Sequence, residues 1–179
     1  MPPPETIPVA DLALVLKARA GDRIAFTALM QRHAAKLNAC LLAYVTPSDV
    51  DDLLQETMLA AWRGLPALQQ TAEPLPWMFG IARNLGRRNY TKRSHQEISL
   101  SQPELLRARE SDGISAAYLL RHIHQLPEAY RVSLALRLLE GFGSASIALA
   151  TGMTEASVRV NLSRGMKILR ENLGREGYP

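Results

Sequence analysis

The sequence predicts an all-α fold of two small helical domains joined by a flexible linker, and three observations predict it. Apolar residues recur with helical spacing in two stretches, which delimit domains at 9–93 and 114–175. No segment alternates apolar and polar residues as a half-buried strand does. The segment 94–113 between the two stretches is polar, contains Pro103 and closes with Gly113, which is typical of a linker.

Composition narrows the class of protein. The chain has 179 residues, of which 47% are hydrophobic and 21% charged, a balance typical of globular proteins. The single cysteine, Cys40, excludes an internal disulfide framework and a multi-cysteine zinc site. The apolar stretches are shorter than the roughly 18 residues that cross a bilayer, so we expect no membrane insertion. Residues 1–8 are expected to form a disordered tail and not a secretory signal.

Turn residues divide the first domain into four helices. Gly21 ends the first helix, and Asp22 can cap the second, expected over 24–44. Pro47 suits the first turn of the third helix, which is expected to end near Gly64. A loop with three prolines follows over 65–76, and a fourth helix is expected over 77–93.

The third helix has an apolar face and an acidic face. On a helical wheel the apolar face includes Val50, Leu53 and Ala61, whereas Leu59 falls in the middle of the acidic face, with Trp62 at its edge. An acidic surface with an apolar centre suits docking on a basic partner, because interfaces favour a desolvated centre and a polar rim. The alternative is a solvated acidic face with one exposed leucine, which is common on protein surfaces.

The fourth helix is basic, with no Asp or Glu between residues 77 and 93. Arg83, Arg87 and Arg88 share one arc of the helix, and such an unpaired basic face attracts polyanions, of which the phosphate backbone is the usual one. A net charge of +4 modestly agrees with this. Trp77 and Tyr90 either stack on unpaired bases or belong to the core.

The second domain carries the spacing of a helix-turn-helix. One helix starts near Pro127 and ends at Gly141, a short helix follows over 144–150, and a longer helix over 155–173 comes after a tight turn at Gly152. Thr154 is its expected cap. The last helix has an apolar stripe opposite short polar and basic side chains, which suits a recognition helix in the major groove. The alternative is an ordinary helical hairpin.

Two sets of motifs, in the order and spacing of one family, resemble bacterial sigma factors of the extracytoplasmic-function type. Residues Asp49–Arg63 and Pro76–Asn84 resemble the first domain of that family. Residues Leu126–Arg131 and Thr151–Arg159 resemble its second domain. The resemblance implies an alternative sigma factor of the cytoplasm that binds core RNA polymerase and promoter DNA, directs transcription initiation, catalyses no reaction, needs no cofactor or metal and is inhibited by an anti-sigma factor.

The resemblance also assigns residues to three surfaces. Core polymerase would be bound by Asp49, Asp52, Gln55, Glu56, Leu59 and Trp62. The −10 element would be recognised and opened by Gln69, Gln70, Thr71, Trp77, Arg83, Asn84, Arg87, Arg88 and Lys92. The −35 duplex would be read by Ser157, Arg159, Val160, Asn161, Ser163, Arg164 and Lys167. Asn161 departs from the family, in which a basic residue is common at this position.

The residues by themselves leave two other functions open. One is a stand-alone helix-turn-helix regulator that binds duplex DNA as a dimer, and the other is a helical adaptor that binds only proteins. No catalytic centre is visible, because His122 and His124 are two residues apart on a helix and therefore diverge. We expect His33 and His95 at the surface and Cys40 in the core.

Overall fold

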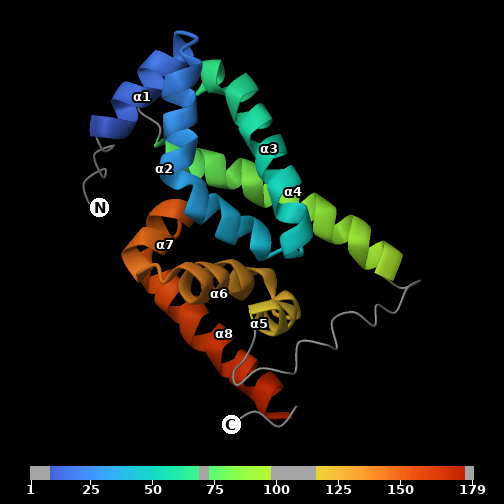
Figure 1. Cartoon of the computed structure of the whole chain (residues 1–179). Helices are drawn as coiled ribbons and strands as arrows, with labels where there is room; N and C mark the ends of the chain where they lie inside the picture. The colour runs from blue at the N-terminus through green and yellow to red at the C-terminus, as the bar shows by residue number, and fades with distance from the viewer. Residues whose placement is uncertain (1–8, 69–72, 98–115, 176–179) are drawn as a thin grey trace.

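The computed structural model describes residues 9–68, 73–97 and 116–175, and over these ranges it is helical, with no strand (Figure 1). The first half comprises α1 (Val9–Arg19), α2 (Arg23–Leu42), α3 (Pro47–Gly64), the short 3-10 helix η1 (Leu65–Ala67) and α4 (Pro74–Glu97). The second half comprises α5 (Ala116–His124), α6 (Glu128–Glu140), α7 (Ser144–Thr151) and α8 (Glu155–Arg175). The prediction of an all-α fold with a C-terminal helix-turn-helix is confirmed, with α7 and α8 as its two helices.

Capping residues fix the helix ends, as the sequence indicated. The Asp22 carboxylate accepts hydrogen bonds from two backbone N–H groups in the first turn of α2, at 2.9 and 3.0 Å. The Thr154 hydroxyl accepts one from the N–H of Ser157 in α8, at 3.2 Å. Gly141 and Gly152 follow α6 and α7 with φ angles of 69° and 71°. This left-handed conformation suits glycine and ends each helix.

The fourth helix is longer than the sequence suggested. It begins at Pro74 and not at Trp77, because Pro74 and Pro76 lie in the first turn, where a helix needs no N–H donor. It also continues to Glu97, four residues past the expected end at Arg93. Residues 69–72, which include the expected −10 loop residues Gln69, Gln70 and Thr71, lie outside the described residues.

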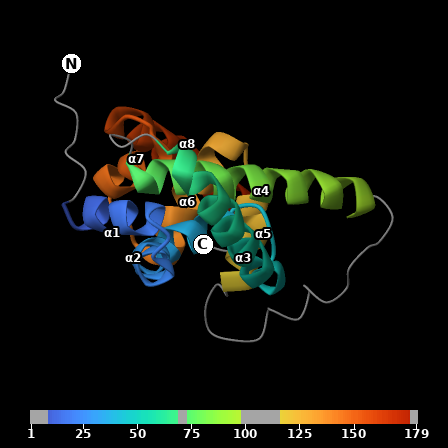
Figure 2. The same ribbon diagram turned by 90° about the horizontal axis from the view of Figure 1, so that it is seen from above.

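The two halves share one hydrophobic core. Helix α2 packs against α1, α3 and α4 of its own half and against α6 of the other half, while α7 packs against α4 (Figure 1). Buried side chains from both halves, such as Met78 and Leu136, belong to one cluster. A smaller cluster that includes Leu134 and Leu169 joins α6 to α8. Seen from above, the C-terminal part of α4 extends beyond the other helices (Figure 2).

Candidate polymerase and nucleic-acid interfaces

The acidic face of α3 is exposed. Asp52, Gln55 and Glu56 are exposed, and Leu59 among them has 56% of its surface accessible. Asp49 is half-buried, and its carboxylate accepts a hydrogen bond from the Thr46 hydroxyl at 2.8 Å. Helix α3 packs mainly against α2 and α4 of its own half. The structure therefore brings these residues together on a surface that the second half leaves open.

Trp62 has a different environment from the rest of this set. Its ring lies edge-on to Phe26, with the ring centroids 5.0 Å apart, and it packs against the core. The side chain is half-buried. Trp62 therefore supports the fold as well as bordering the acidic face.

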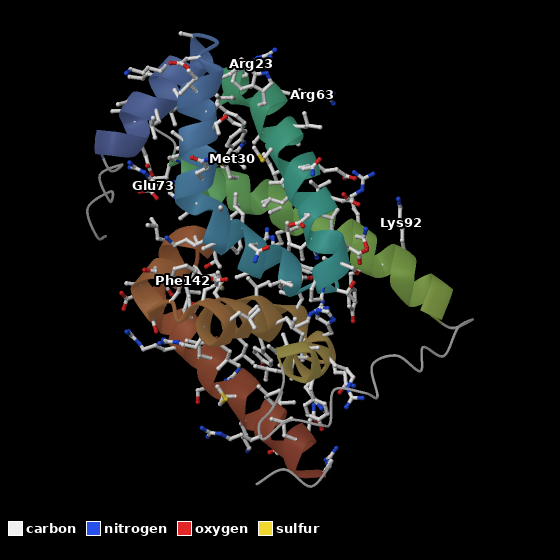
Figure 3. All side chains as sticks on the ribbon, viewed as in Figure 1. Arg23, Met30, Arg63, Glu73, Lys92 and Phe142 are labelled. Carbon is white, nitrogen blue, oxygen red and sulfur yellow. The ribbon has the colours of Figure 1, made fainter. Side chains whose placement is uncertain are left out.

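The basic face of α4 forms an open hollow of about 720 Å³. Arg83 is also exposed, but it lines a neighbouring cavity of about 370 Å³ between α4 and the second half. Lys92 projects from the extended part of α4, away from the other helices (Figure 3). The hollow is lined by Asn84, Arg87, Arg88, Thr91 and Lys92.

One arginine of this face has an acidic partner that the sequence did not indicate. The Arg87 Nε lies 3.1 Å from a Glu128 carboxylate oxygen, and Glu128 belongs to α6 in the other half. The second oxygen of Glu128 accepts a hydrogen bond from the Tyr44 hydroxyl at 2.9 Å. Burial raises the pKa of the Tyr44 hydroxyl, and the bond to Glu128 adds to this effect. The basic face is thus partly neutralised from within the chain.

The aromatic residues of α4 mostly serve packing. Phe79 is 2% exposed and belongs to the core. The Tyr90 hydroxyl donates a hydrogen bond to the backbone carbonyl of His124 at 3.2 Å. Trp77 is half-buried, and a Cβ atom added at Gly64 would lie 3.1 Å from its ring. Trp77 and Tyr90 therefore both keep partial exposure, whereas Phe79 is buried.

The outward face of α8 is polar and basic. Val158 and Leu169 are buried on the opposite face, at 0% and 2% exposure. Asn161 is half-buried, and its side-chain amide donates to the Met153 sulfur at 3.5 Å, which holds it against the turn before α8. The residues that the structure exposes together are Ser157, Arg159, Val160, Ser163, Arg164 and Lys167.

Arg159 is held along the helix that carries it. Its guanidinium Nη1 lies 2.8 Å from a Glu155 carboxylate oxygen, one turn earlier on α8. Both side chains are largely exposed, so this pair contributes little to stability. Its effect is to limit the directions in which Arg159 extends from the helix.

The expectation that His33 lies at the surface is wrong. His33 is 6% exposed, and its Nε2 lies 2.9 Å from the carboxylate of Asp11, which also pairs with Arg32 at 3.0 Å. Burial lowers the pKa of His33, and Asp11 opposes this by raising it. The side chain of His95 lies outside the described residues. Cys40 is fully buried, as expected, and burial raises the pKa of its thiol.

The described part of the chain lacks two further features. It contains no group of three or more His, Cys, Asp or Glu side chains placed to hold a metal ion. None of its helices is long and apolar enough to pass through a bilayer.

Comparisons with known proteins match both halves of the chain. Residues 29–96 match the family described as Sigma-70 region 2, and residues 116–169 match Sigma-70, region 4. The chain is 26% identical to the ECF RNA polymerase sigma-E factor of Haemophilus influenzae, over 92% of this chain and 96% of the relative. It is 29% identical to the RNA polymerase sigma factor NccH of Alcaligenes xylosoxydans xylosoxydans, over 89% of this chain and 92% of the relative.

Two solved structures of other proteins are similar in fold to this chain. The structure of CnrH in complex with the cytosolic domain of CnrY superposes with a TM-score of 0.68 at 25% identity, covering 94% of this chain and 99% of that one. The sigma factor RpoE in complex with the anti-sigma factor NepR from Bartonella quintana matches with a TM-score of 0.58 over 83% of this chain and 96% of that one. At 19% identity, this second likeness shows the fold alone.

The two matched regions contain the candidate surfaces described above, in the same order along the chain. Region 2 covers the acidic face of α3 and the basic face of α4, and region 4 covers the helix-turn-helix. A stand-alone regulator is not favoured, because it would have no need of region 2. The chain belongs to the extracytoplasmic-function group of the sigma-70 family and is an alternative sigma factor that directs RNA polymerase to promoters.

Proposed function

We propose that this chain divides the work of an alternative sigma factor among three surfaces: α3 binds core polymerase, α4 opens the −10 element, and α8 reads the −35 duplex. The observation that supports this division is the distribution of charge. The exposed face of α3 is acidic around Leu59, whereas the exposed faces of α4 and α8 are basic and polar. An acidic surface repels DNA phosphates, so it suits a protein partner, and the basic surfaces suit nucleic acid.

On α3, binding centres on Leu59. The side chain is more than half exposed, so a partner that covers it gains apolar burial. Asp52, Gln55 and Glu56 surround it and suit a basic rim on the partner. Trp62 contributes its exposed edge, and Asp49 contributes mainly to the start of the helix, through its hydrogen bond with Thr46.

On α4, Arg88 and Lys92 neutralise phosphates of the opened strand, and Asn84 contacts an unpaired base at the same hollow. Separating a base from its stack costs a few kcal/mol, which contacts to the extracted base offset. Gln69, Gln70 and Thr71 of the preceding loop are assigned this base contact by family resemblance alone.

On α8, the side chains that enter the major groove are Arg159, Val160, Ser163 and Arg164, with Ser157, Asn161 and Lys167 nearer the phosphates. An arginine can pair bidentately with guanine, and a small apolar side chain can contact a thymine methyl group. The chain itself supplies no chemistry in this proposal, because core polymerase forms the RNA bonds. It acts in the cytoplasm, and its activity is controlled by an anti-sigma factor.

In vitro transcription with purified core polymerase tests the division. The chain is expected to support initiation at a defined start site, and Arg88→Ala with Lys92→Ala is expected to reduce opening of the −10 element while core binding persists. Lys17→Ala, an exposed cation on α1, serves as the matched control. A chain that forms dimers and protects duplex DNA without polymerase would instead be a stand-alone regulator.

A further inference from the structure

A small polar cavity is lined by side chains of α1, α2, the start of α4 and α7. Its volume is about 250 Å³, below the range of about 300–1,000 Å³ for sites that hold drug-sized molecules, so it suits a ligand of a few heavy atoms. None of the residues that line it belongs to the surfaces proposed for polymerase or DNA. The ionisable side chains in its wall are those of Asp11, Arg32, His33, Lys36 and Glu73.

Asp11 and His33 form a buried pair in the wall of this cavity. Asp11 is 3% exposed and His33 is 6% exposed. One oxygen of Asp11 accepts a hydrogen bond from the Arg32 guanidinium at 3.0 Å, and the other lies 2.9 Å from Nε2 of His33. A carboxylate only accepts hydrogen bonds, so the proton of the neutral His33 ring is assigned to Nε2. The pair thereby fixes the tautomer and the orientation of the ring.

The other ring nitrogen of His33 is left as a buried acceptor. Burial lowers the pKa of His33 below 6.5 despite the opposing effect of Asp11, so the ring is neutral at about pH 7.5. Its Nδ1 then carries a lone pair, and this atom is buried without a hydrogen-bond partner among the described residues. A buried acceptor without a donor costs free energy. His33 therefore favours a ligand that brings an N–H or O–H group into the cavity.

Two cations stand beside this acceptor on the same helix. Lys36 follows Arg32 by four positions and His33 by three on α2, so its side chain neighbours both. The guanidinium of Arg32 uses Nη1 for Asp11 and keeps other N–H groups, and its side chain is 45% exposed. The Lys36 amine lies 4.9 Å from the centroid of the Phe142 ring, a contact that occupies none of its N–H groups in a hydrogen bond to oxygen. These two cations favour an anionic group on the ligand.

The rest of the wall limits the charge and shape of the ligand. Glu73 lies directly before α4, on the side of the molecule where α1 packs (Figure 3), and its carboxylate repels a second negative charge. Pro74 and Leu75, which are buried, and Leu149, which is half-buried, add apolar surface. The cavity therefore suits a small monoanion with a short apolar part better than a dianion.

We propose that this cavity binds a small monocarboxylate that carries a hydroxyl or amino group on the carbon next to the carboxylate. Arg32 and Lys36 hold the carboxylate, and Nδ1 of His33 accepts a hydrogen bond from the neighbouring group. The apolar wall contacts the short side chain of the ligand. This inference does not rest on the proposed function, because it involves no contact with polymerase or DNA.

Three probes that differ in a single group test the proposal. Propionate, L-lactate and L-alanine share a carboxylate and a methyl group, and their middle carbon carries a hydrogen, a hydroxyl and an ammonium group respectively. Each is titrated at equal ionic strength into the ¹⁵N-labelled full-length chain at about pH 7.5. The shifts of the backbone amides of α1 and α2 give the Kd, and the signals of the His33 ring nitrogens report on its acceptor.

L-Lactate or L-alanine is expected to bind at least about tenfold more tightly than propionate, because propionate leaves Nδ1 without a donor. The Nδ1 signal of His33 is expected to move on binding, and the tighter of the two ligands identifies the donor as a hydroxyl or an ammonium group. Equal affinities for all three probes would overturn the proposal. So would the absence of a saturable shift with any of them up to about 100 mM.

Two substitutions separate the parts of the site. His33→Gln keeps a donor for Asp11, because the amide nitrogen of glutamine can replace the ring Nε2, but it removes the Nδ1 acceptor. It is expected to reduce the affinity for the preferred probe to that for propionate. Lys36→Met is expected to weaken binding of all three probes several-fold, whereas Lys17→Met, at an exposed position on α1, is the matched control and should change nothing. Unchanged affinity for the preferred probe in Lys36→Met, with the amide spectrum of a folded chain, would overturn the assignment.

Discussion

Replacing Leu59 by alanine measures how much the apolar centre of the α3 face contributes to polymerase binding. Burying a whole leucine side chain contributes about 1.5–3 kcal/mol. Leu59 is 56% exposed, so about half of that remains to be gained on docking. Leu59→Ala is therefore expected to weaken binding by about 0.8–1.5 kcal/mol, or about four- to twelvefold in Kd. Anisotropy of the labelled chain, titrated with core polymerase at fixed salt, measures this change.

The Kd measured for Leu59→Ala needs a control in which another exposed apolar side chain is shortened to alanine. Ile24 is 83% exposed at the start of α2, away from the acidic face, so Ile24→Ala is expected to leave the Kd unchanged. Trp62→Ala is a less direct probe, because the loss of packing against Phe26 costs stability as well as contact. A Kd for Leu59→Ala within twofold of the parent chain would show that α3 does not dock through this residue.

Three other outcomes are expected from single substitutions. Arg164→Ala should weaken binding to the −35 duplex by about 1–3 kcal/mol in a competition assay, whereas Arg170→Ala on the same helix should leave sequence discrimination unchanged. Gly165→Ala should destabilise the fold by about 1–3 kcal/mol in urea unfolding, because the added Cβ atom would lie 2.9 Å from side-chain atoms of α6. The control Gly174→Ala adds its Cβ atom in open space and should stabilise the fold by about 0.5 kcal/mol. Burial lowers the pKa of His33 from 6.5, so on acidification this imidazole is protonated in the unfolded chain before it is protonated in the folded one. The free energy of unfolding should therefore fall as the pH drops below 6.5. Unfolding of the parent chain and His33→Gln at about pH 7.5 and 5.5 checks this, and an equal pH dependence in both would contradict it.

Helix boundaries were predictable where local chemistry sets them. Asp22, Thr154 and the glycines that follow α6 and α7 act within one turn of their own position, so the sequence contains all the information needed. The sequence predicts the start of α4 three residues late, because the two prolines of its first turn also fit the end of a loop. Prolines fit both structures, and only the backbone that follows distinguishes them.

Buried polar pairs were harder to predict. His33 follows Met30 by three positions and precedes Leu37 by four, so helical periodicity already placed it on the buried face of α2. What the sequence could not show was the Asp11 partner on another helix that makes this burial tolerable. The polarity of a lone histidine favours the surface, whereas its position in the helical period favours burial.

Contacts between the halves could not be predicted at all. Tyr44 and Glu128 are 84 positions apart, on either side of a polar segment whose length sets no fixed geometry. The sequence of α4 contains no acidic residue over 77–93, but this says nothing of other helices, and Arg87 pairs with Glu128 of α6. The three candidate surfaces follow from local helical periodicity, whereas their relative positions depend on contacts that cross the whole chain.

Helix α7 is eight residues long and is followed by Gly152 in the left-handed conformation, while the helix before it ends at Gly141 in the same conformation. Backbone torsions at these two points set the turns that lead into α7 and α8, and buried side chains such as Leu169 hold α8 against α6, so the orientation of α8 does not depend on its exposed residues. Under the proposed reading of the −35 duplex by α8, its exposed residues can be exchanged to recognise new promoter sequences while the helix keeps its orientation. The same property would let substitutions on the exposed face of α8 be combined by design without disturbing its packing against α6.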